Sequence, residues 1–389
     1  MEVHPMAHRQ WRIVAAGVIS AAALLLAACS SSSKNSGKAS DTPGSSTGAS
    51  SSAATSADAY AATFTEPATG SNPAAKGKSV WVISVGQASP TGAASANAAM
   101  KAGQAIGWKM HLYDAKLDPA QFSNGIKQAI AAKADGVVLI AVDCPAAKSA
   151  LQQAKSAGVK TVGVYALDCN EVDPSDQGLY SAQVSFGSRY ANLADAYKAW
   201  GADSAKWAIA QTDGKANVLS FENSEYNILK FYQQGFDAQI KTCSGCKLTV
   251  VPWLAADFGA KLTALTQAAL LKNPDANVVQ GGSNPTLGIT QGVVQAGKQT
   301  KIKSIGGLGL SIDNDAIRQG QMTAANAWPT EWFGFAAIDT LNSVFSGTTP
   351  RDEGLGWQIV DNSHGLPAKG DFTGDVNYIA AYTKSWGVG

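Results

Sequence analysis

Short apolar runs alternate with longer amphipathic stretches from Ser79 onward. This rhythm predicts βαβ units, in which each buried strand is followed by a helix and the strands form a parallel sheet. The first series of predicted strands covers 80–85, 109–113, 137–142 and 161–165. A second series of similar spacing covers 217–221, 248–251, 277–280, 301–305 and 322–326. The two series predict an α/β protein with two similar lobes, each a doubly wound parallel sheet.

Helical patterns separate the predicted strands. The stretch 122–132 is preceded by Asp118 and Pro119, a cap residue and a first-turn residue, and the stretch 146–157 is followed by Gly158, a helix stop. Ligands of open parallel sheets bind beyond the carboxyl ends of the strands. If the two lobes turn these ends toward each other, a small-molecule site is expected in the cleft between them.

The N-terminus carries an export signal. Two arginines precede an apolar run of 16 residues that ends at Ala28. As a helix this run spans roughly 24 Å, too short for the ~30 Å hydrocarbon core of a bilayer, so residues 1–28 are predicted to be a signal peptide. The motif Leu-Ala-Ala-Cys at 26–29 resembles a bacterial lipobox, which implies that Cys29 carries lipid and anchors the protein. The alternative is an ordinary secretory signal followed by a chance cysteine.

Residues 29–78 follow the signal and consist mainly of Ser, Ala, Thr, Gly and Pro. A segment with so few large apolar residues cannot offset the entropy lost on ordering. We therefore expect a disordered tether, with a reach of roughly 40 Å as a flexible coil, between the membrane and the folded lobes.

Four cysteines remain after Cys29, and exported proteins meet oxidising conditions. Cys144 and Cys169 each follow a predicted strand of the first lobe, so neighbouring strands would bring them together as a disulfide. Cys243 and Cys246 would close a much smaller ring. The alternatives for this second pair are a redox site or half of a zinc site. However, a redox CxxC normally opens a helix after a strand, and no second CxxC or nearby His completes a metal set.

Charge and motifs narrow the function. The chain has 389 residues, 15% of them charged, and a formal net charge of +1, so it offers no basic surface for nucleic acid. No nucleophile elbow, Walker motif or dinucleotide-binding glycine motif is found. His111 and His364 lack the partners of a catalytic triad or a metal site. We expect no enzyme activity, no cofactor and no bound metal.

A series of short motifs runs through both predicted lobes. In the first they are Asp114-Ala115, Asp118-Pro119, Gln121, Ala134-Asp135-Gly136-Val137, Val142-Asp143 and Ala157-Gly158-Val159. In the second they are 231–236, Asn273-Pro274-Asp275, Ile305-Gly306-Gly307 and Arg318-Gln319-Gly320. In this order, from about 79 to 361, they resemble the ribose-type subgroup of type I periplasmic binding proteins, the extracytoplasmic receptors of ABC importers.

The resemblance implies a chain that crosses between the lobes near Phe186, Ala327 and Gly356. The N-terminal lobe then comprises 79–186 plus 328–356, the C-terminal lobe 187–327 plus 357–375, and residues 376–389 form a C-terminal tail. It also implies that the lobes close around a small-molecule solute and deliver it to an ABC permease. We expect a monomer that is lipid-anchored at the extracytoplasmic face of the cell membrane.

Ten residues are expected to contact the solute: most lie near strand ends or crossings, and Lys230 falls near an arginine of the family. The ten are Gln87, Ser89, Asp143, Tyr165, Phe186, Tyr226, Lys230, Ser283, Asn326 and Trp328. Sugar-binding members of the family hold hydroxyls with charged and amide side chains, but here Tyr165-Ala166 and Leu308 stand at such positions. A site without those paired groups cannot offset the desolvation of several hydroxyls. The expected solute has fewer hydroxyls, or more apolar or aromatic surface, than a free monosaccharide.

Each of these expectations has a structural alternative. The four aromatic residues among the ten can instead pack in a core or support the hinge, and Lys230 can be a solvated helix lysine. For the whole protein, the same fold can present a solute to a chemoreceptor or histidine kinase instead of a permease. A secreted α/β hydrolase is a further alternative, and it would need a nucleophile motif that the chain lacks.

Overall fold

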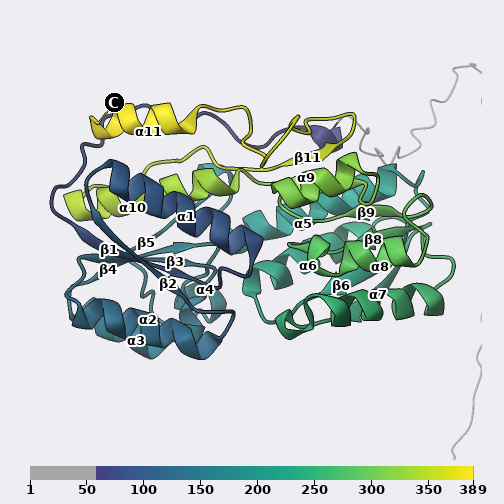
Figure 1. The fold of residues 1–389 in the computed structure, drawn as a ribbon, viewed down its shortest axis with the longest axis horizontal. Coiled ribbons are helices and arrows are strands. Elements are labelled where there is room, and N and C mark those ends of the chain that lie inside the picture. Colours follow the sequence, from purple (N-terminus) through teal and green to yellow (C-terminus); the bar gives the residue numbers. More distant parts are fainter. Residues whose placement is uncertain (1–57, 389) are drawn as a thin grey trace, which may run out of the picture. The chain divides into compact units, whose positions relative to one another are not determined.

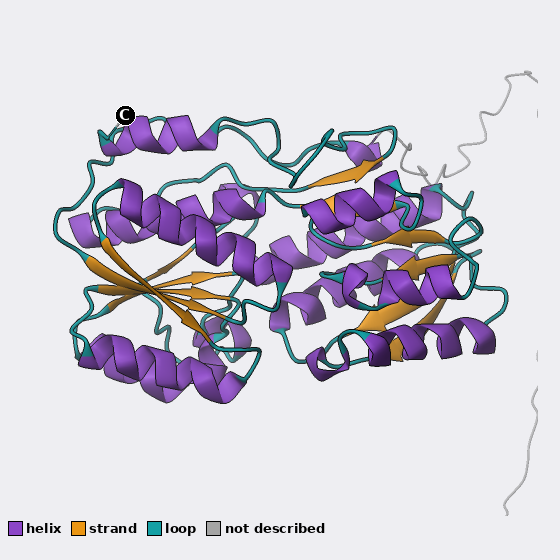
Figure 2. Ribbon diagram, in the orientation of Figure 1, coloured by secondary structure: helices purple, strands orange, loops and turns teal. Residues whose placement is uncertain are grey.

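The computed structural model describes residues 58–388 (Figure 1). The predicted signal peptide 1–28, Cys29 and the predicted tether up to residue 57 lie outside the described residues. The described part is an α/β structure with two separate sheets, each covered by helices (Figure 2). Among its helices, none combines the length and the apolar character that crossing a bilayer requires.

The first lobe is built on a five-stranded parallel sheet of order β2-β1-β3-β4-β5. Its strands are β1 (Ser79–Ser84), β2 (Lys109–Asp114), β3 (Gly136–Ile140), β4 (Lys160–Val164) and β5 (Ala182–Gln183). Its helices are α1 (Pro90–Ala105), α2 (Pro119–Ala131), α3 (Cys144–Ser156), α4 (Cys169–Val172) and α10 (Thr330–Ser346). Every residue of β3 is buried, because α1 and α10 cover one face of the sheet and α2 and α3 cover the other.

The second lobe is built on a six-stranded sheet of order β11-β10-β9-β8-β6-β7. Its strands are β6 (Asn217–Glu222), β7 (Lys247–Pro252), β8 (Val278–Gln280), β9 (Lys303–Ile305), β10 (Ala324–Ala327) and β11 (Gln358–Asp361), the last antiparallel to β10. Its helices are α5 (Leu193–Ala210), α6 (Asn227–Ile240), α7 (Ala260–Lys272), α8 (Ile289–Gln295) and α9 (Ser311–Arg318). Gly201 of α5 allows close packing on α6, since a Cβ there would lie 1.9 Å from the carbonyl oxygen of Tyr232.

The structure confirms the α/β architecture and all nine predicted strands, with ends shifted by at most two residues. Asp118 caps α2 as predicted, because its side chain accepts a hydrogen bond from the N–H of Ala120 at 2.9 Å. The short β5, the antiparallel β11 and the last helix, α11 (Tyr378–Trp386), were not predicted.

The predicted tether needs correction at its end, and the predicted C-terminal tail proves to contain a helix. Residues 58–78 were expected to belong to the disordered tether, but they begin with the short 3₁₀ helix η1 (Asp58–Tyr60), and Tyr60 and Asn72 are buried. The predicted tail contains α11, whose Tyr382 and Trp386 are buried. The composition of 58–78 predicted disorder. A few large side chains are nevertheless enough to order a polar segment when they can pack against the folded lobes.

Three connections join the lobes: β5 to α5, β10 to α10, and α10 to β11. A cluster of aromatic rings lies where they meet. Trp328 packs with its ring centroid 5.2 Å from that of Phe186 and 5.3 Å from that of Phe333, and Trp357 packs 5.4 Å from Phe186. All four side chains are buried. Aromatic pairs of this kind contribute more than their buried area alone, so the cluster fixes the hinge region.

Both expected disulfides are present. Cys144 is joined to Cys169 and Cys243 to Cys246, with Cα atoms 4.9 and 5.4 Å apart. Cys144 and Cys169 meet because β3 and β4 are neighbours, as the strand pattern predicted.

Candidate functional site

A cavity of about 70 Å³ lies between the lobes, beyond the carboxyl ends of the parallel strands. Every strand from β1 to β4 and from β6 to β9 is followed by a residue that lines it. These residues are Val85, Leu117, Ala141, Tyr165, Tyr226, Trp253, Ser283 and Leu308. Small-molecule sites usually enclose about 300–1,000 Å³, so the cavity is small in this arrangement of the lobes.

The cavity wall is mostly apolar. Its aromatic members are Tyr165, Trp200, Tyr226, Trp253 and Phe258, and its other large apolar members are Val85, Leu117, Ile228, Leu229 and Leu308. The polar side chains besides the tyrosines and tryptophans are Ser89, Thr91, Ser283 and Asn284. Within residues 58–388, no charged side chain lines this cavity. The wall therefore suits a neutral solute with apolar surface.

The two tyrosines of the wall stay neutral at physiological pH. Burial raises the pKa of Tyr165 well above its ordinary value, although a hydrogen bond with Ser95 at 3.0 Å opposes the rise. Burial raises the pKa of Tyr226 to about 12, with smaller contributions from the nearby carboxylates of Glu225 and Asp143. Their hydroxyls can therefore donate as well as accept hydrogen bonds.

Strained backbone is concentrated around the cavity. Eight non-glycine residues of the described chain have positive φ, and four of them, Leu117, Ala141, Tyr165 and Asn284, line the cavity. Their φ angles are 61°, 54°, 53° and 53°. The left-handed region is unfavourable for residues with a Cβ, so such conformations persist only where the surroundings impose them. In each case the turn aims a residue that follows a strand into the space between the lobes.

Asn284 of the second lobe bridges to the first lobe at the cavity wall. Its Oδ1 accepts a hydrogen bond from the hydroxyl of Thr91 at 3.1 Å, and its Nδ2 donates to the hydroxyl of Ser89 at 3.4 Å. Ser89 is also the cap residue of α1 and accepts from the N–H of Gly92. These neutral contacts close the lobes without any ion pair.

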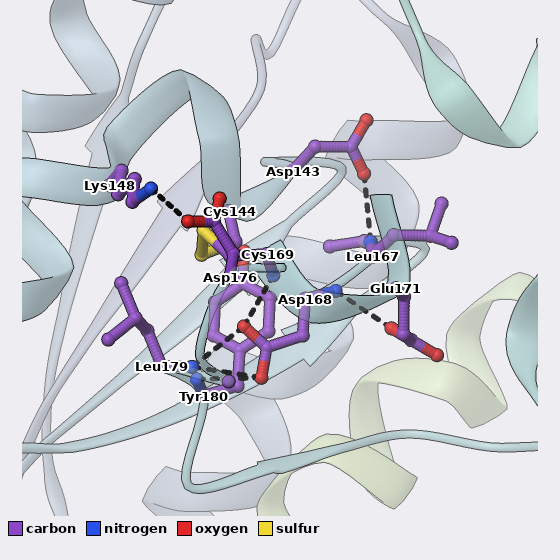
Figure 3. Close-up of a disulfide and its surroundings, with 12 residues drawn as sticks. Asp143, Cys144, Lys148, Leu167, Asp168, Cys169, Glu171, Asp176, Leu179 and Tyr180 are labelled. Atoms are coloured by element: carbon purple, nitrogen blue, oxygen red, sulfur yellow. Dashed lines mark hydrogen bonds and ion pairs between the residues drawn. A yellow bond between two sulfur atoms is a disulfide. The ribbon is translucent and has the colours of Figure 1, made fainter. Parts of the chain in front are cut away.

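Asp143 makes a second contact between the lobes. Figure 3 shows its other contact, with Leu167 of the first lobe. Asp143 lies at the start of α3, and its Oδ1 accepts from the N–H of Leu167 in the same lobe at 2.8 Å. Its Oδ2 accepts from the backbone N–H of Asn227 at 3.1 Å and from the side-chain Nδ2 of Asn227 at 3.0 Å. Burial raises the pKa of Asp143, and these hydrogen bonds oppose the rise. Asp143 thus caps α6 of the other lobe.

Four of the ten predicted contact residues, Ser89, Tyr165, Tyr226 and Ser283, line the cavity. Three others belong to the hinge instead. Phe186 and Trp328 are members of the aromatic cluster, and Asn326 donates to the carbonyl oxygen of Trp200 at 3.1 Å and to Ser204 at 2.9 Å. These three side chains pack where the lobes are connected, because the crossings of the chain lie behind the cavity and do not line it.

The remaining three predicted contact residues lie outside the cavity wall. Asp143 connects the lobes as described above. The N–H of Gln87 donates to Asp114 at 3.0 Å, which keeps this loop residue beside β2. Lys230 is exposed on α6, which agrees with the alternative of a solvated helix lysine. Its Nζ lies 3.4 Å from Oδ1 of Asn227.

Several wall residues were missed by the sequence reasoning. They are Thr91, Trp200, Trp253, Phe258 and Asn284, besides the aliphatic members. Trp253 comes directly after β7 and Asn284 comes shortly after β8, so the rule that ligands bind beyond strand ends could have found both. Trp200 lies inside α5, and nothing in its local pattern separates it from a core residue.

The Cys144–Cys169 disulfide joins the starts of α3 and α4 (Figure 3). Asp168, next to it, accepts hydrogen bonds from the backbone N–H groups of Cys169 at 2.7 Å and of Leu179 at 2.8 Å. The carboxylate of Asp168 and the sulfur atoms of Cys144 and Cys169 form the one group of potential metal ligands found in the described residues. Both sulfur atoms are joined to each other, so they cannot act as thiolate ligands.

Comparison with known proteins places the chain in a family. Residues 81–349 match the periplasmic binding protein domain family, and the chain belongs to this family, as the motif order indicated. No curated protein matches the sequence.

Solved structures share the fold. An ABC transporter solute-binding protein from Agrobacterium vitis with bound allitol is 18% identical, with a TM-score of 0.64 over 74% of this chain and 96% of that chain. One from Mycobacterium smegmatis with bound glycerol is 20% identical, with a TM-score of 0.64 over 76% of this chain and 99% of that one. The binding component of the arabinose ABC transporter from Shewanella sp. ANA-3 is 16% identical, with a TM-score of 0.64 over 79% and 95%.

Proposed function

We propose that this protein is an extracytoplasmic solute-binding lipoprotein of an ABC importer. It binds a small neutral solute in the cavity between its lobes, and Cys29 anchors it to the outer face of the cell membrane. The family supports the binding role, and the lipobox at 26–29 supports the anchor. The solute passes to a membrane permease when the lobes separate.

One observation carries the proposal: residues after eight parallel strands converge on a single cavity whose wall is apolar and uncharged. A catalytic site needs groups that exchange protons or attack a substrate. The wall offers only serine, threonine, asparagine, tyrosine and indole groups as polar partners. Such groups hold a neutral molecule and suit capture and release.

The wall also limits the class of solute. Allitol, glycerol and arabinofuranose are bound by the structural neighbours, and each exposes several hydroxyls to its receptor. Here five aromatic side chains leave few partners for hydroxyls, and every unpaired buried hydroxyl costs about 1–3 kcal/mol. The solute is therefore a sugar-like or polyol-like molecule with few free hydroxyls, such as a deoxygenated, methylated or aryl-substituted one.

Thermal unfolding with a panel of solutes tests the proposal. The panel contains glycerol, ribose, arabinose, a methylated pentoside, a deoxysugar, an aryl glycoside and an aromatic acid. A solute held at 100 times its Kd stabilises the folded protein by about 2.7 kcal/mol, so a clear rise in Tm is expected for a neutral member with few hydroxyls. A large rise with ribose alone would refute the low-hydroxyl solute.

A pair of variants ties any binding to the cavity. Trp253→Ala removes a ring from the wall, whereas Trp81→Ala removes a tryptophan of β1 that does not line the cavity. The first variant should lose at least tenfold in affinity for the solute found, and the second should bind like the parent. Equal losses in both would place the site elsewhere.

A further inference from the structure

The polar segment that precedes the first strand spans the hinge. Residues 58–75, here named the N-terminal strap, contact the second lobe at one end and the first lobe at the other. The family match covers residues 81–349 and begins after the strap. Figure 1 shows it running along the same side of the described structure as β11 and α11.

Tyr60 fixes the strap to the second lobe. Its hydroxyl donates to Oδ2 of Asp361 in β11 at 2.5 Å and accepts from Nε1 of Trp207 at 3.0 Å. Its ring stacks on His364, with the centroids 3.8 Å apart. The phenol is buried. This end is held by side chains of both α5 and the β11 region.

The middle of the strap pairs with the last connection between the lobes. The N–H of Thr63 donates to the carbonyl oxygen of Trp357 at 2.9 Å, and the N–H of Thr65 donates to that of Gly354 at 2.8 Å. The backbones lie so close that a Cβ at Gly354 would come within 2.5 Å of the carbonyl oxygen of Glu66. Glycine at 354 is thus explained by the strap.

Asn72 fixes the other end to the first lobe. Its Nδ2 donates to Oδ1 of Asp339 at 3.0 Å and to the hydroxyl of Ser343 at 3.1 Å, both on α10. The N–H of Ala75 donates to the side chain of Asn342 at 2.8 Å. Asn72 is buried, as Tyr60 is at the other end.

The C-terminal segment 366–386 makes a further crossing next to the strap. In the second lobe, the N–H of Phe372 donates to the carbonyl oxygen of Gly309 at 2.7 Å. In the first lobe, Trp386 of α11 donates to Oδ1 of Asp339 at 2.7 Å. The strap and this segment also touch each other, because the N–H of Asn72 donates to the carbonyl oxygen of Ser385 at 2.9 Å.

From these contacts we infer that the N-terminal strap restrains the opening of the two lobes and thereby favours the closed cavity. Rotation of the lobes must twist the connection at 354–357, and the strap is hydrogen-bonded along it while its two ends are held by different lobes. The inference concerns the regulation of the cavity and takes its meaning from the proposed function. Its test does not depend on solute binding.

The test cuts the strap after the protein has folded. A recognition sequence for a specific protease is inserted after Thr69, an exposed position of the strap. Spin labels are placed on Gln128→Cys in α2 and Leu271→Cys in α7, both exposed and in different lobes. The distance distribution between the labels is measured by pulsed electron spin resonance before and after cleavage, with no solute added. Cleavage is expected to add a population at longer distance.

Two further variants make the outcome decisive. The same recognition sequence inserted after Asp213, in an exposed turn of the second lobe, should leave the distances unchanged on cleavage. Tyr60→Ala, which releases one end of the strap without a cut, should produce the longer distances by itself. Unchanged distances after cleavage at residue 69 would overturn the inference, whatever solute the protein binds.

Discussion

On the cavity side, the lobes meet through a few polar contacts: those of Asp143 with Asn227, and those of Asn284 with Thr91 and Ser89. On the hinge side, three chain connections, the N-terminal strap and the C-terminal segment join the same lobes around a buried aromatic cluster. Contacts of the first kind can be exchanged for water at small cost. The difference teaches that separating the lobes on the cavity side would break far fewer contacts than separating them on the hinge side.

Among the hinge-side residues, Asp339 is the one whose removal should lower the free energy of unfolding most. Its buried carboxylate accepts from Arg351 at 2.8 Å, and it also accepts from Asn72 and Trp386. Asp339→Ala leaves the guanidinium and two donors without their partner, so the free energy of unfolding should fall by about 3–5 kcal/mol. Urea unfolding measures this loss.

Asp195 provides the matched control for Asp339. It pairs with Lys198 on the surface of α5, where both side chains are more than 40% exposed. Asp195→Ala should cost about 0–1 kcal/mol. If the two variants were equally stable, the network around Asp339 would not be what holds the strap and α11 to the first lobe.

The disulfide at the cavity end of the first lobe should have the next largest effect. Its cysteines are 25 residues apart, so loop entropy predicts that Cys144→Ala with Cys169→Ala lowers the unfolding free energy by about 3.5 kcal/mol. The pair Cys243 and Cys246, 3 residues apart, should contribute about 2 kcal/mol by the same reasoning. Calorimetry of both double variants measures the difference, and the reverse order would contradict the entropic account.

A smaller effect is expected at the contact of Asp143 with the second lobe. Asp143→Ala leaves the N–H of Asn227 without its acceptor, at a cost of about 1–3 kcal/mol while the lobes are closed. When the lobes separate, water can replace the lost acceptor. Small-angle X-ray scattering should therefore report a larger radius of gyration for this variant. Asn227→Ala removes only the side-chain donor and should open less, and a radius equal to that of the parent in both would refute the closing role.

The smallest effect is a pH dependence at the cavity end of the second lobe. Burial, with the nearby Asp237, raises the pKa of Glu222 from 4.5 to about 7, and its Oε1 has no hydrogen-bond partner. The folded protein therefore binds this proton more tightly than the unfolded chain. The contribution to stability is complete below pH 4.5 and is lost as the pH rises to about 7.

Glu222→Gln isolates this contribution. The amide cannot titrate, so the difference in unfolding free energy between parent and variant should change between pH 4.5 and 7 and be constant outside that range. Denaturant unfolding at a series of pH values measures it. A difference that is independent of pH would show that Glu222 keeps its ordinary pKa.

Some of the predicted site residues lie on the cavity side of the lobes, and others lie on the hinge side. Ser89, Tyr165, Tyr226 and Ser283 line the cavity, and all four follow strands that the apolar runs locate. Phe186 and Trp328 were placed in the site by family position, yet they pack in the hinge. Trp200 was missed because an aromatic residue within a helix has the same local pattern whether it faces a core or a cavity.

The sequence by itself determined the strands, the order of the lobes and the cysteine pairs, because apolar periodicity and spacing are local properties of the chain. Only the tertiary structure decided that Asp143 joins the lobes, that Asn284 reaches Ser89 and Thr91, and that the strap packs across the hinge. Each of these depends on groups brought together from distant parts of the sequence. No local sequence pattern encodes such a long-range contact, because the contact stabilises the protein only after both surfaces have folded.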